Sequence, residues 1–521
     1  MTPRVFTIPA SAPFLPTLIE ALLGGRLGFA PAADPLTLAA ATLYLPTRRA
    51  CRLARDAFLD VLRDDAAILP RIVAIGDIDE DEIAFAEAAT GELAGEALAL
   101  PEALGGLERR LLLTQLVRKW AGTPQLHGAA GTPLVAQTPA AACALADDLA
   151  RLIDDMTMRG VPWDRLDTLV PQEFDEYWQR TLRFLQIARE AWPAVLDERQ
   201  LIEPAERRDR LIKAEAARLQ KNNAPVIAAG STGSIPATAE LIATISRLPH
   251  GAVVLPGLDV DLDEESWQLI AGDQKKKIAP ASGHPQFALQ ALLTRIGITR
   301  DAVQPLAQTR GREKLVSEAL RPALKTDLWR QQATETAFAD FTAKALESVT
   351  VIEAANAEEE ALAVALVLRE ANQEGKTAAL VTPDRGLGRR VLAALARWNI
   401  DAEDSGGDAL ADTPAGVFAR LAAETALGGL EPVTLLALLK HAMLRLDLPA
   451  KETAVAALER AVLRGPRPNA GSRGLAVALN AIRTALGKIR RNESTDLHWS
   501  DPRIALTEAE LAAASDLVAR L

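Results

Sequence analysis

The sequence predicts an α/β protein whose parallel-sheet domains carry large helical insertions. Short apolar runs alternate with amphipathic segments near the N-terminus and again after residue 345, as in β–α–β units. Hydrophobic residues make up 49% of the chain but aromatic residues only 4%. This composition favours a core of Ala, Leu, Val and Ile, with helices packed on parallel strands. The 521 residues require at least two domains, because one core rarely exceeds about 250–300 residues.

Residues 1–270 are expected to form the first domain. Strand-like runs are separated by helix-forming segments such as FLPTLIEALL, and this order is typical of parallel strands joined by helices. Between about residues 90 and 220 the pattern is helical only, with i, i+4 charge pairs, so a helical insertion is expected there. The expected strands are VFTI, ATLYLP, RIVAI, PVIAAG and AVVLPGL.

The rest of the chain is expected to contain a second, partial domain. Residues 271–345 are mixed in pattern and predict an irregular and helical connection. Residues 346–420 are expected to begin a second α/β domain, and residues 421–521 a helical insertion. The strands expected in this second domain are SVTVIEAAN, AALVTPD and NIDAEDSGG.

The last helical segment bears on whether this second domain is complete. It opens with a capping box of Thr507 and Glu510 and then stops without a capping residue. The second domain also offers only about three strands, fewer than a typical sheet has. We therefore expect the chain to stop before its second domain is complete, with a natural C-terminal helix as the alternative.

Two segments share one pattern and are the best functional clue. Residues 43–59 and 379–395 each contain an apolar strand, a Pro-containing turn and an arginine-rich amphipathic helix, with Thr47 and Asp384 as expected N-caps. Cations are disfavoured at the positive end of a helix, so arginines there suggest an external anion such as phosphate. The alternative is surface arginines paired with neighbouring acids. The candidate phosphate-binding residues are Thr47, Arg48, Arg49, Arg52, Thr382, Arg385, Arg389 and Arg390.

A glycine-bearing turn is a third candidate. The sequence AAGSTGS at 228–234 ends an expected strand and precedes a helix, so its amides could accept an anion beside Ser231 and Thr232. Glycine and serine are also ordinary residues of such turns, and no lysine is present. Phosphate contact and a plain turn therefore both remain open.

No nucleotide-hydrolysing motif is found. The triplet Gly375-Lys376-Thr377 precedes an expected strand instead of following one, and Glu370 occupies the position of the first glycine of a phosphate loop. The loop after the first strand, residues 9–13, contains neither glycine nor lysine. The sequence therefore predicts no phosphate loop, and ATP hydrolysis by this chain alone is not expected.

Acidic clusters and histidines give no convincing catalytic or metal site. The cluster at residues 77–82 suits a helix N-terminus, and residues 259–270 lack the glycine and the final glutamate of an EF-hand. Asp273 and Lys275 suggest a nuclease motif but lack the strand that would hold them rigid. The five histidines are scattered. We expect no catalytic residue, metal or cofactor in this chain.

Composition also limits location and partners. Cys51 and Cys143 are the two cysteines, which excludes a disulfide framework and favours a reducing compartment, hence the cytoplasm. No signal peptide and no apolar run of about 18 residues is found, so no membrane span is expected. The net charge of −11 argues against a chain that coats nucleic acid but permits a local basic groove.

Taken together, several segments resemble the AddB family in its alphaproteobacterial form. AddB proteins are subunits of the AddAB helicase–nuclease, which repairs DNA double-strand breaks by homologous recombination. The resemblance runs in order along nearly the whole chain. It is carried by LYLPTRRACR, RIVAIGDIDEDE, QRTLRFLQIAREAWPAVLDERQLIEPAERRDRL, VIAAGSTGSIPATAELIA, AVVLPGLDVDLDEESW, HPQF, SEALRP and AALVTPDRGLGRRV.

The resemblance implies a fold, partners and roles. It implies two RecA-like domains similar to those of superfamily-1 helicases, each with a helical insertion, and a heterodimer with an AddA subunit that supplies ATP-driven translocation. It also implies contact with single-stranded or duplex-end DNA. Family members carry a nuclease domain with an iron–sulfur cluster and magnesium in their C-terminal half. The cysteines for that cluster are not in this sequence, so neither cofactor is expected here.

The expected function is therefore binding without chemistry. On this interpretation the chain is a non-catalytic, helicase-like part of an AddB-type subunit that holds single-stranded DNA. The alternative is a protein-interaction scaffold that does not contact DNA. An autonomous NTP-dependent enzyme is a third class, against which the missing phosphate loop argues. The residues that would recognise a hotspot sequence are not assigned.

Overall fold

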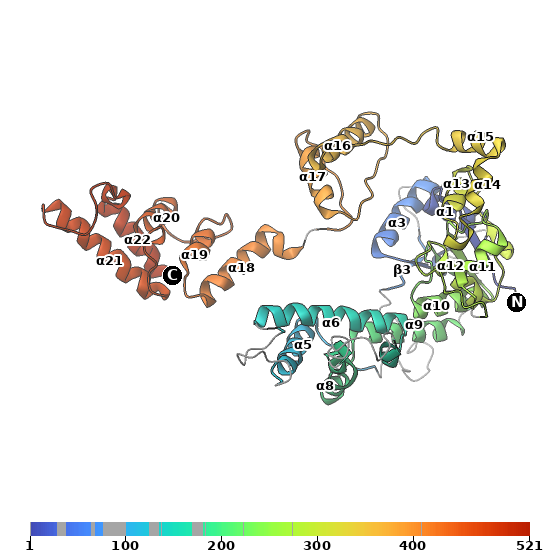
Figure 1. The fold of residues 1–521 in the computed structure, drawn as a ribbon, viewed down its shortest axis with the longest axis horizontal. Helices are drawn as coiled ribbons and strands as arrows, with labels where there is room; N and C mark the ends of the chain where they lie inside the picture. Colours follow the sequence, from blue (N-terminus) through green and yellow to red (C-terminus); the bar gives the residue numbers. More distant parts are fainter. Residues whose placement is uncertain are drawn as a thin grey trace. The chain divides into compact units, whose positions relative to one another are not determined.

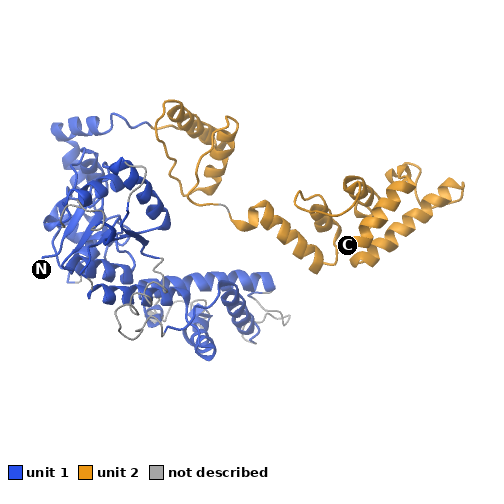
Figure 2. Cartoon of the chain, turned by 180° about the vertical axis from the view of Figure 1, so that it is seen from behind, with its two compact units in different colours: residues 1–350 blue, residues 351–521 orange. Residues whose placement is uncertain are grey.

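The computed structural model consists of two compact units, residues 1–350 and residues 351–521, which are coloured separately in Figure 2. Each unit is described by itself below. The residues that the structure describes are 2–28, 38–63, 68–76, 100–123, 135–136, 138–168, 181–182, 184–221, 223–273, 275–407 and 409–521.

The first unit is built on a six-stranded, all-parallel sheet with the strand order β3-β2-β4-β5-β1-β6. All five strands expected in this part of the sequence are present, so the α/β prediction is confirmed. The interior strands are almost fully buried, as expected of parallel strands covered on both faces. The strands are β1 Val5–Ile8, β2 Thr42–Leu45, β3 Arg71–Ala74, β4 Val226–Ala229, β5 Gly251–Pro256 and β6 Gln304–Pro305.

Two helical layers cover the two faces of this sheet (Figure 1). Alternate residues of one strand serve opposite layers: Phe6 packs with the first layer, whereas Val5 packs with the second. The first layer contains α1 Phe14–Leu23 and α3 Arg48–Leu62. The second contains α9 Pro204–Leu219, α10 Pro236–Arg247, α11 Glu264–Ala271 and α12 Phe287–Ile296.

This arrangement creates a crevice at one edge of the sheet. β1 leads into α1 in the first layer, while its neighbour β5 leads into α11 and α12 in the second layer. Adjacent strands whose connections leave toward opposite faces open a gap at their carboxyl ends, and ligands of open α/β sheets bind in such gaps.

A helical insertion lies between β3 and β4, as the sequence predicted. It has its own core, in which Trp192 and Leu149 are buried. Arg109 joins its helices through ion pairs with Asp154 at 2.9 Å and with Glu203 at 3.0 Å. The helices of the insertion that precede α9 are α5 Gly106–Ala121, α6 Pro139–Arg159 and α8 Trp192–Arg199, with a 3₁₀ helix at Trp163–Thr168 and a π-helical turn at Ile187–Ala191.

Residues 271–345, which we expected to be a connection, belong to the first unit. They supply β6, which pairs with β1, and α12, whose Leu289 and Leu293 enter the core on the second face. β6 has only two residues, one of them proline, so no strand pattern marks it in the sequence. The remaining elements here are a 3₁₀ helix at Arg300–Ala302, α13 Arg312–Ala319, a 3₁₀ helix at Ala323–Lys325, α14 Leu328–Ala333 and α15 Thr336–Ala345.

The second unit differs from the expected second parallel sheet. Its first part contains α16 Ala357–Gln373 and α17 Arg385–Ala396, which pack together, but none of its described residues forms a strand. The described residues of the segments expected to be strands pair with no neighbour, and Val351 is 82% and Val381 93% exposed. A parallel sheet needs helices on both faces, and two helices cannot cover both faces of three strands.

The rest of the second unit is helical, as predicted, and has its own core. The capping box at Thr507 is confirmed: Thr507 Oγ1 accepts from the Glu510 amide, and Glu510 Oε2 accepts from the Thr507 amide at 2.8 Å. Nowhere in the described parts of either unit is a helix long and apolar enough to cross a bilayer. The helices are α18 Pro414–Leu427, α19 Pro432–Leu439, α20 Lys451–Leu458, α21 Gly471–Arg490 and α22 Glu508–Arg520, with a π-helical turn at Glu459–Leu463 and 3₁₀ helices at Leu410–Asp412 and Pro502–Ala505.

Candidate nucleic-acid interface

Two of the candidate segments meet at the carboxyl edge of the sheet. β2 and β4 are neighbours, with Tyr44 opposite Ala228. The register therefore places Pro46 beside Gly230, and a Cβ added to Gly230 would lie 3.5 Å from Pro46 Cδ. Gly230 also has φ +77°, which a residue with a side chain rarely adopts. Thr47 and Ser231 are the next residues, so the two turns begin side by side.

Thr47 caps α3 as predicted. Its backbone is extended, and its Oγ1 accepts a hydrogen bond from the Ala50 amide at 3.1 Å. Cys51 and Phe58 anchor the helix in the sheet core. The N-terminus of α3 is therefore held at the carboxyl edge, where the helix dipole is positive.

The arginines of α3 face solvent along one side of the helix. Arg48, Arg52 and Arg55 are exposed and lie at spacings of four and three residues, which places them on one helical face. Arg52 and Arg55 form no ion pair or hydrogen bond with any described residue. Arg49 is half-buried. Arg55 was not among the predicted contact residues, although its spacing from Arg48 and Arg52 places it on the same helical face.

The turn after β4 combines an internal hydrogen bond with a free hydroxyl. Ser231 Oγ accepts from the Gly233 amide at 3.3 Å, so part of the anion-accepting capacity of the turn is used internally. The Thr232 hydroxyl has no partner in the described chain. α10 then begins with Pro236, which offers no amide. The turn can therefore contribute a hydroxyl contact more readily than a full amide cradle.

The arginines of the second segment are ion-paired. Arg385 lies 2.9 Å from Asp404 and donates to the Gly407 carbonyl, Arg390 lies 3.2 Å from Glu358, and Arg389 lies 3.7 Å from Asp412. This contact pattern matches the alternative interpretation, surface arginines with acidic neighbours. The predicted N-cap is present, since Asp384 Oδ1 accepts from the Gly386 amide. Thr382 Oγ1 accepts from the Asp384 amide, so it shapes this turn.

The loop after β1, where a phosphate loop would lie, binds a carboxylate of the chain itself. The Ser11 amide donates to Glu313 Oε1 at 3.2 Å. Burial opposes the charge on Glu313, but the nearby Ser11 hydroxyl and the local amides favour it, and the pKa of Glu313 falls below its usual value. An ionised carboxylate at this position repels phosphate.

Two cavities occupy the crevice between β1 and β5. The smaller, of about 450 Å³, is mainly apolar and lies between the turns after β1, β2, β4 and β5, against Phe14, Pro46 and Leu53. The larger, of about 600 Å³, is polar and charged; it lies between the turns after β1 and β5 and is walled by α13. Both cavities are where an open α/β sheet binds ligands.

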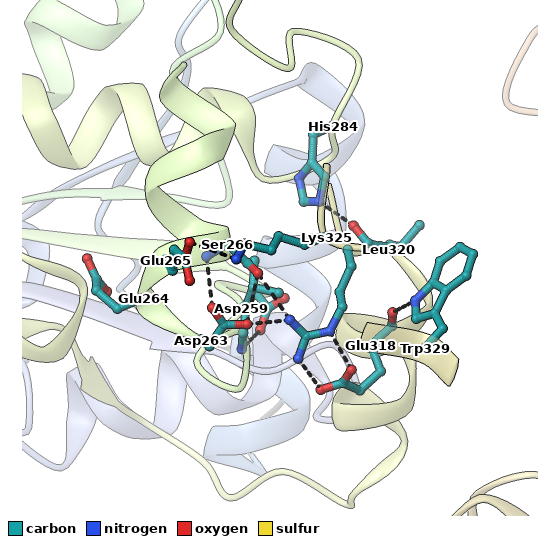
Figure 3. A network of polar contacts seen from close by, with 12 residues as sticks. Asp259, Asp263, Glu264, Glu265, Ser266, His284, Glu318, Leu320, Lys325 and Trp329 are labelled. Atoms are coloured by element: carbon teal, nitrogen blue, oxygen red, sulfur yellow. Dashed lines mark hydrogen bonds and ion pairs between the residues drawn. The ribbon is translucent and has the colours of Figure 1, made fainter. Parts of the chain in front are cut away.

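A polar network fixes the walls of the larger cavity (Figure 3). Buried Arg321 donates twice to Glu318, at 2.6 and 2.8 Å, and once to Asp263, which caps α11. Gln286 donates to the Gly257 carbonyl and accepts from the Asp259 amide. Three segments quoted for the resemblance, LDVDLDEESW, HPQF and SEALRP, therefore converge on one loop.

The remaining acidic motifs have structural roles where the structure describes them. Asp259 Oδ1 accepts from the amides of Asp261 and Leu262, and Asp273 Oδ1 accepts from the amides of Lys275 and Lys276. Among the described residues, no group of three or more His, Cys, Asp or Glu side chains could hold a metal ion. The described residues end at Gly76 and resume at residue 100, so the acidic cluster at 77–82 lies outside them.

No known family model and no curated protein matches the sequence. This edge of the sheet presents the capped N-terminus of α3, two cations further along that helix, Arg52 and Arg55, that are unpaired among the described residues, a neighbouring hydroxyl turn and an apolar hollow.

Proposed function

We propose that this chain is a non-catalytic, helicase-like part of an AddB-type subunit and binds single-stranded DNA at the carboxyl edge of its sheet. In this proposal it works in the cytoplasm, pairs with an AddA subunit that supplies the motor, and contributes to double-strand break repair by homologous recombination. Its RecA-like domain holds the strand and performs no chemistry.

One observation supports the proposal most directly. Arg52 and Arg55 are exposed, carry no acidic partner among the described residues, and follow the capped N-terminus of α3. Two unpaired guanidinium groups three residues apart on one helix repel each other, and bound phosphates relieve this repulsion. The Thr232 hydroxyl on the neighbouring turn adds a neutral contact to the same backbone.

Contacts of this kind position a strand but do not read its sequence. Guanidinium and hydroxyl groups bind phosphates, which are the same at every nucleotide. The net charge of −11 keeps the rest of the surface from binding nucleic acid without preference. The proposal therefore places strand binding at one edge of the first unit.

The test is the affinity of the full chain for a labelled single-stranded oligothymidylate, measured by fluorescence anisotropy between 50 and 400 mM salt. Each phosphate that a guanidinium group neutralises contributes a log–log slope of about −0.7 for single strands, so the two arginine contacts predict a slope near −1.4. Absence of binding at 50 mM salt, with the protein folded, would refute the proposal. Mg–ATP is expected to leave the melting temperature unchanged.

The second candidate function is a protein-interaction scaffold without DNA contact. It is supported by the exposed apolar side chains of Val351 and Val381 in the second unit, on segments that pair with no strand among the described residues. The two functions differ in the salt experiment, because a scaffold predicts no oligonucleotide binding at any salt concentration.

A further inference from the structure

The larger cavity of the first unit has carboxylates inside and cations at its mouth. Asp259 and Glu313 are partly buried in its lining, whereas Arg310, Arg312 and Lys344 are exposed. Asp261 lies near both carboxylates, and burial together with the charge of Asp259 raises its pKa. Carboxylates crowded in this way are stabilised by a bound cationic group.

A second, independent observation comes from the hydrogen bonds of the wall. Ser317, which is 4% exposed, lines the cavity, and its hydroxyl has no hydrogen-bond partner among the described residues. Ser11 Oγ and Glu313 Oε2 have no hydrogen-bond partner of good geometry among the described residues either, although they lie close enough for the Ser11 hydroxyl to favour the charge on Glu313. Glu313 and Ser317 are four residues apart on α13, and Glu313 is bonded to the Ser11 amide, so the three oxygens belong to one corner of the cavity.

Unpaired buried oxygens are costly, and native proteins normally satisfy them. The ionised carboxylate only accepts hydrogen bonds and the two hydroxyls can accept as well as donate, so one cationic donor with several hydrogens would satisfy all three oxygens. A primary ammonium group has three donor hydrogens and no acceptor. The corner contains one carboxylate and two hydroxyls, and the described residues include no group of three His, Cys, Asp or Glu side chains that could hold a metal ion. A phosphate does not suit the corner, because Glu313 already occupies the Ser11 amide.

We propose that this cavity binds the primary ammonium group of an amine, with the ammonium at Ser11, Glu313 and Ser317 and any anionic end of the ligand at the exposed cations of the mouth. The amine is either a small molecule or a lysine side chain of a partner protein. The cavity volume of about 600 Å³ admits either one. Because the phosphate-contact turns follow β2 and β4, this inference does not depend on the proposed strand binding.

The walls are rigid enough to recognise such a group. Arg321 ties α13 to the start of α11 through Glu318 and Asp263 (Figure 3). Gln286 holds the loop after β5 through the Asp259 amide and the Gly257 carbonyl. Residues held by a second layer of hydrogen bonds stay in place when a ligand arrives. The network leaves the three oxygens themselves unpaired.

The full chain is titrated with three amines: γ-aminobutyrate, n-butylamine and a capped lysine tripeptide. Binding is measured by calorimetry and by the change in melting temperature. Butyrate, which has no ammonium group, is the control. Saturable binding of at least one amine, and none of butyrate, is expected. Preference for γ-aminobutyrate indicates a small zwitterion, and preference for the tripeptide indicates a lysine side chain. Failure of all three amines to saturate would overturn the proposal.

Variants locate the site. Glu313→Gln keeps the shape of the side chain but removes its charge, and it is expected to weaken amine binding at least about tenfold. Ser317→Ala is expected to weaken binding while leaving the melting temperature of the free protein unchanged or higher, because it removes an unpaired buried hydroxyl. Glu347→Gln, an exposed carboxylate near the cavity, is the matched control and leaves binding unchanged.

If Glu313→Gln does not fold, Asp261→Asn tests the same charge from an exposed position. The assignment is refuted if Ser317→Ala and whichever carboxylate variant folds bind the amine as tightly as the wild type does. That result would place the ammonium group elsewhere. Loss of oligonucleotide binding has no bearing on this result, so the two proposals fail separately.

Discussion

Neutralising two arginines of α3 gives the sharpest test of the proposed interface. The change is the double substitution Arg52→Gln and Arg55→Gln. Both side chains are exposed and have no described partner, so their removal breaks no internal contact. Glutamine is a good helix former, and exposed substitutions of this kind usually change the free energy of unfolding by less than about 0.5 kcal/mol. Any loss of DNA binding then reflects lost contacts with the strand.

The magnitude follows from the number of phosphates released. Two contacts to a single strand account for about 1.4 units of log–log salt slope. With that slope, the affinity of the wild type falls roughly sevenfold between 50 and 200 mM salt. The double variant has lost both contacts, so its affinity is expected to change little over the same range. The variant is therefore expected to bind more weakly at 50 mM salt and to approach the wild-type affinity at 400 mM.

The assay is anisotropy with a labelled oligothymidylate, with melting curves to confirm folding. The matched control is Arg385→Gln with Arg389→Gln, which removes the same charge from arginines that are paired with Asp404 and Asp412. This control is expected to change the slope less, since those arginines must leave their acids before they can bind phosphate. An unchanged slope in the α3 variant would refute the reasoning.

Two further predictions concern the fold of the first unit. Tyr44→Phe removes the hydrogen bond from the Tyr44 hydroxyl to Glu215, a carboxylate that is 1% exposed, while Arg218 still donates to it twice at 2.6 Å. The free energy of opening measured by hydrogen exchange at the β2 and β4 amides is expected to fall by about 1–3 kcal/mol in the variant. Amide protection equal to that of the wild type would contradict this prediction. Burial opposes ionisation of Asp263, but hydrogen bonds from Ser266 and Arg321 outweigh it and lower its pKa to about 2. Because the pKa of Asp263 is lower in the folded protein, its ionised form stabilises the fold fully above about pH 4, and this stabilisation is lost as the pH falls toward 2. The urea midpoint of unfolding is expected to fall over this pH range, and Asp263→Asn is expected to remove that fall.

The sequence predicted the sheet well where strands are long and apolar. β1, β2, β4 and β5 are apolar runs bounded by Pro or Gly, and each was placed within about two residues. β6 could not be predicted, because it consists of Gln304 and Pro305 and pairs only through its neighbour β1. The strand order was not predicted either, since it depends on which face each connecting helix covers.

The described residues of the second unit lack the predicted sheet for a physical reason that a local sequence pattern does not contain. SVTVIEAAN and AALVTPD have the composition of strands, but a strand is stable only with a neighbour and a covered face. In the described second unit, α16 and α17 bury their apolar residues against each other and leave Val351 and Val381 exposed. Composition predicted strands here, and without a neighbouring strand the ladder does not form.

The two arginine-rich segments show what a shared pattern predicts and what it leaves open. Both produce a capped helix whose first turns carry arginines, so the local prediction is correct twice. Whether an arginine is ion-paired depends on acidic residues elsewhere in the sequence. The arginines of α17 pair with Asp404, Asp412 and Glu358. Arg52 and Arg55 of α3 meet no acidic side chain among the described residues. Spacing within a helix therefore locates candidate phosphate contacts, and only the fold around the helix shows which cations remain available to bind them.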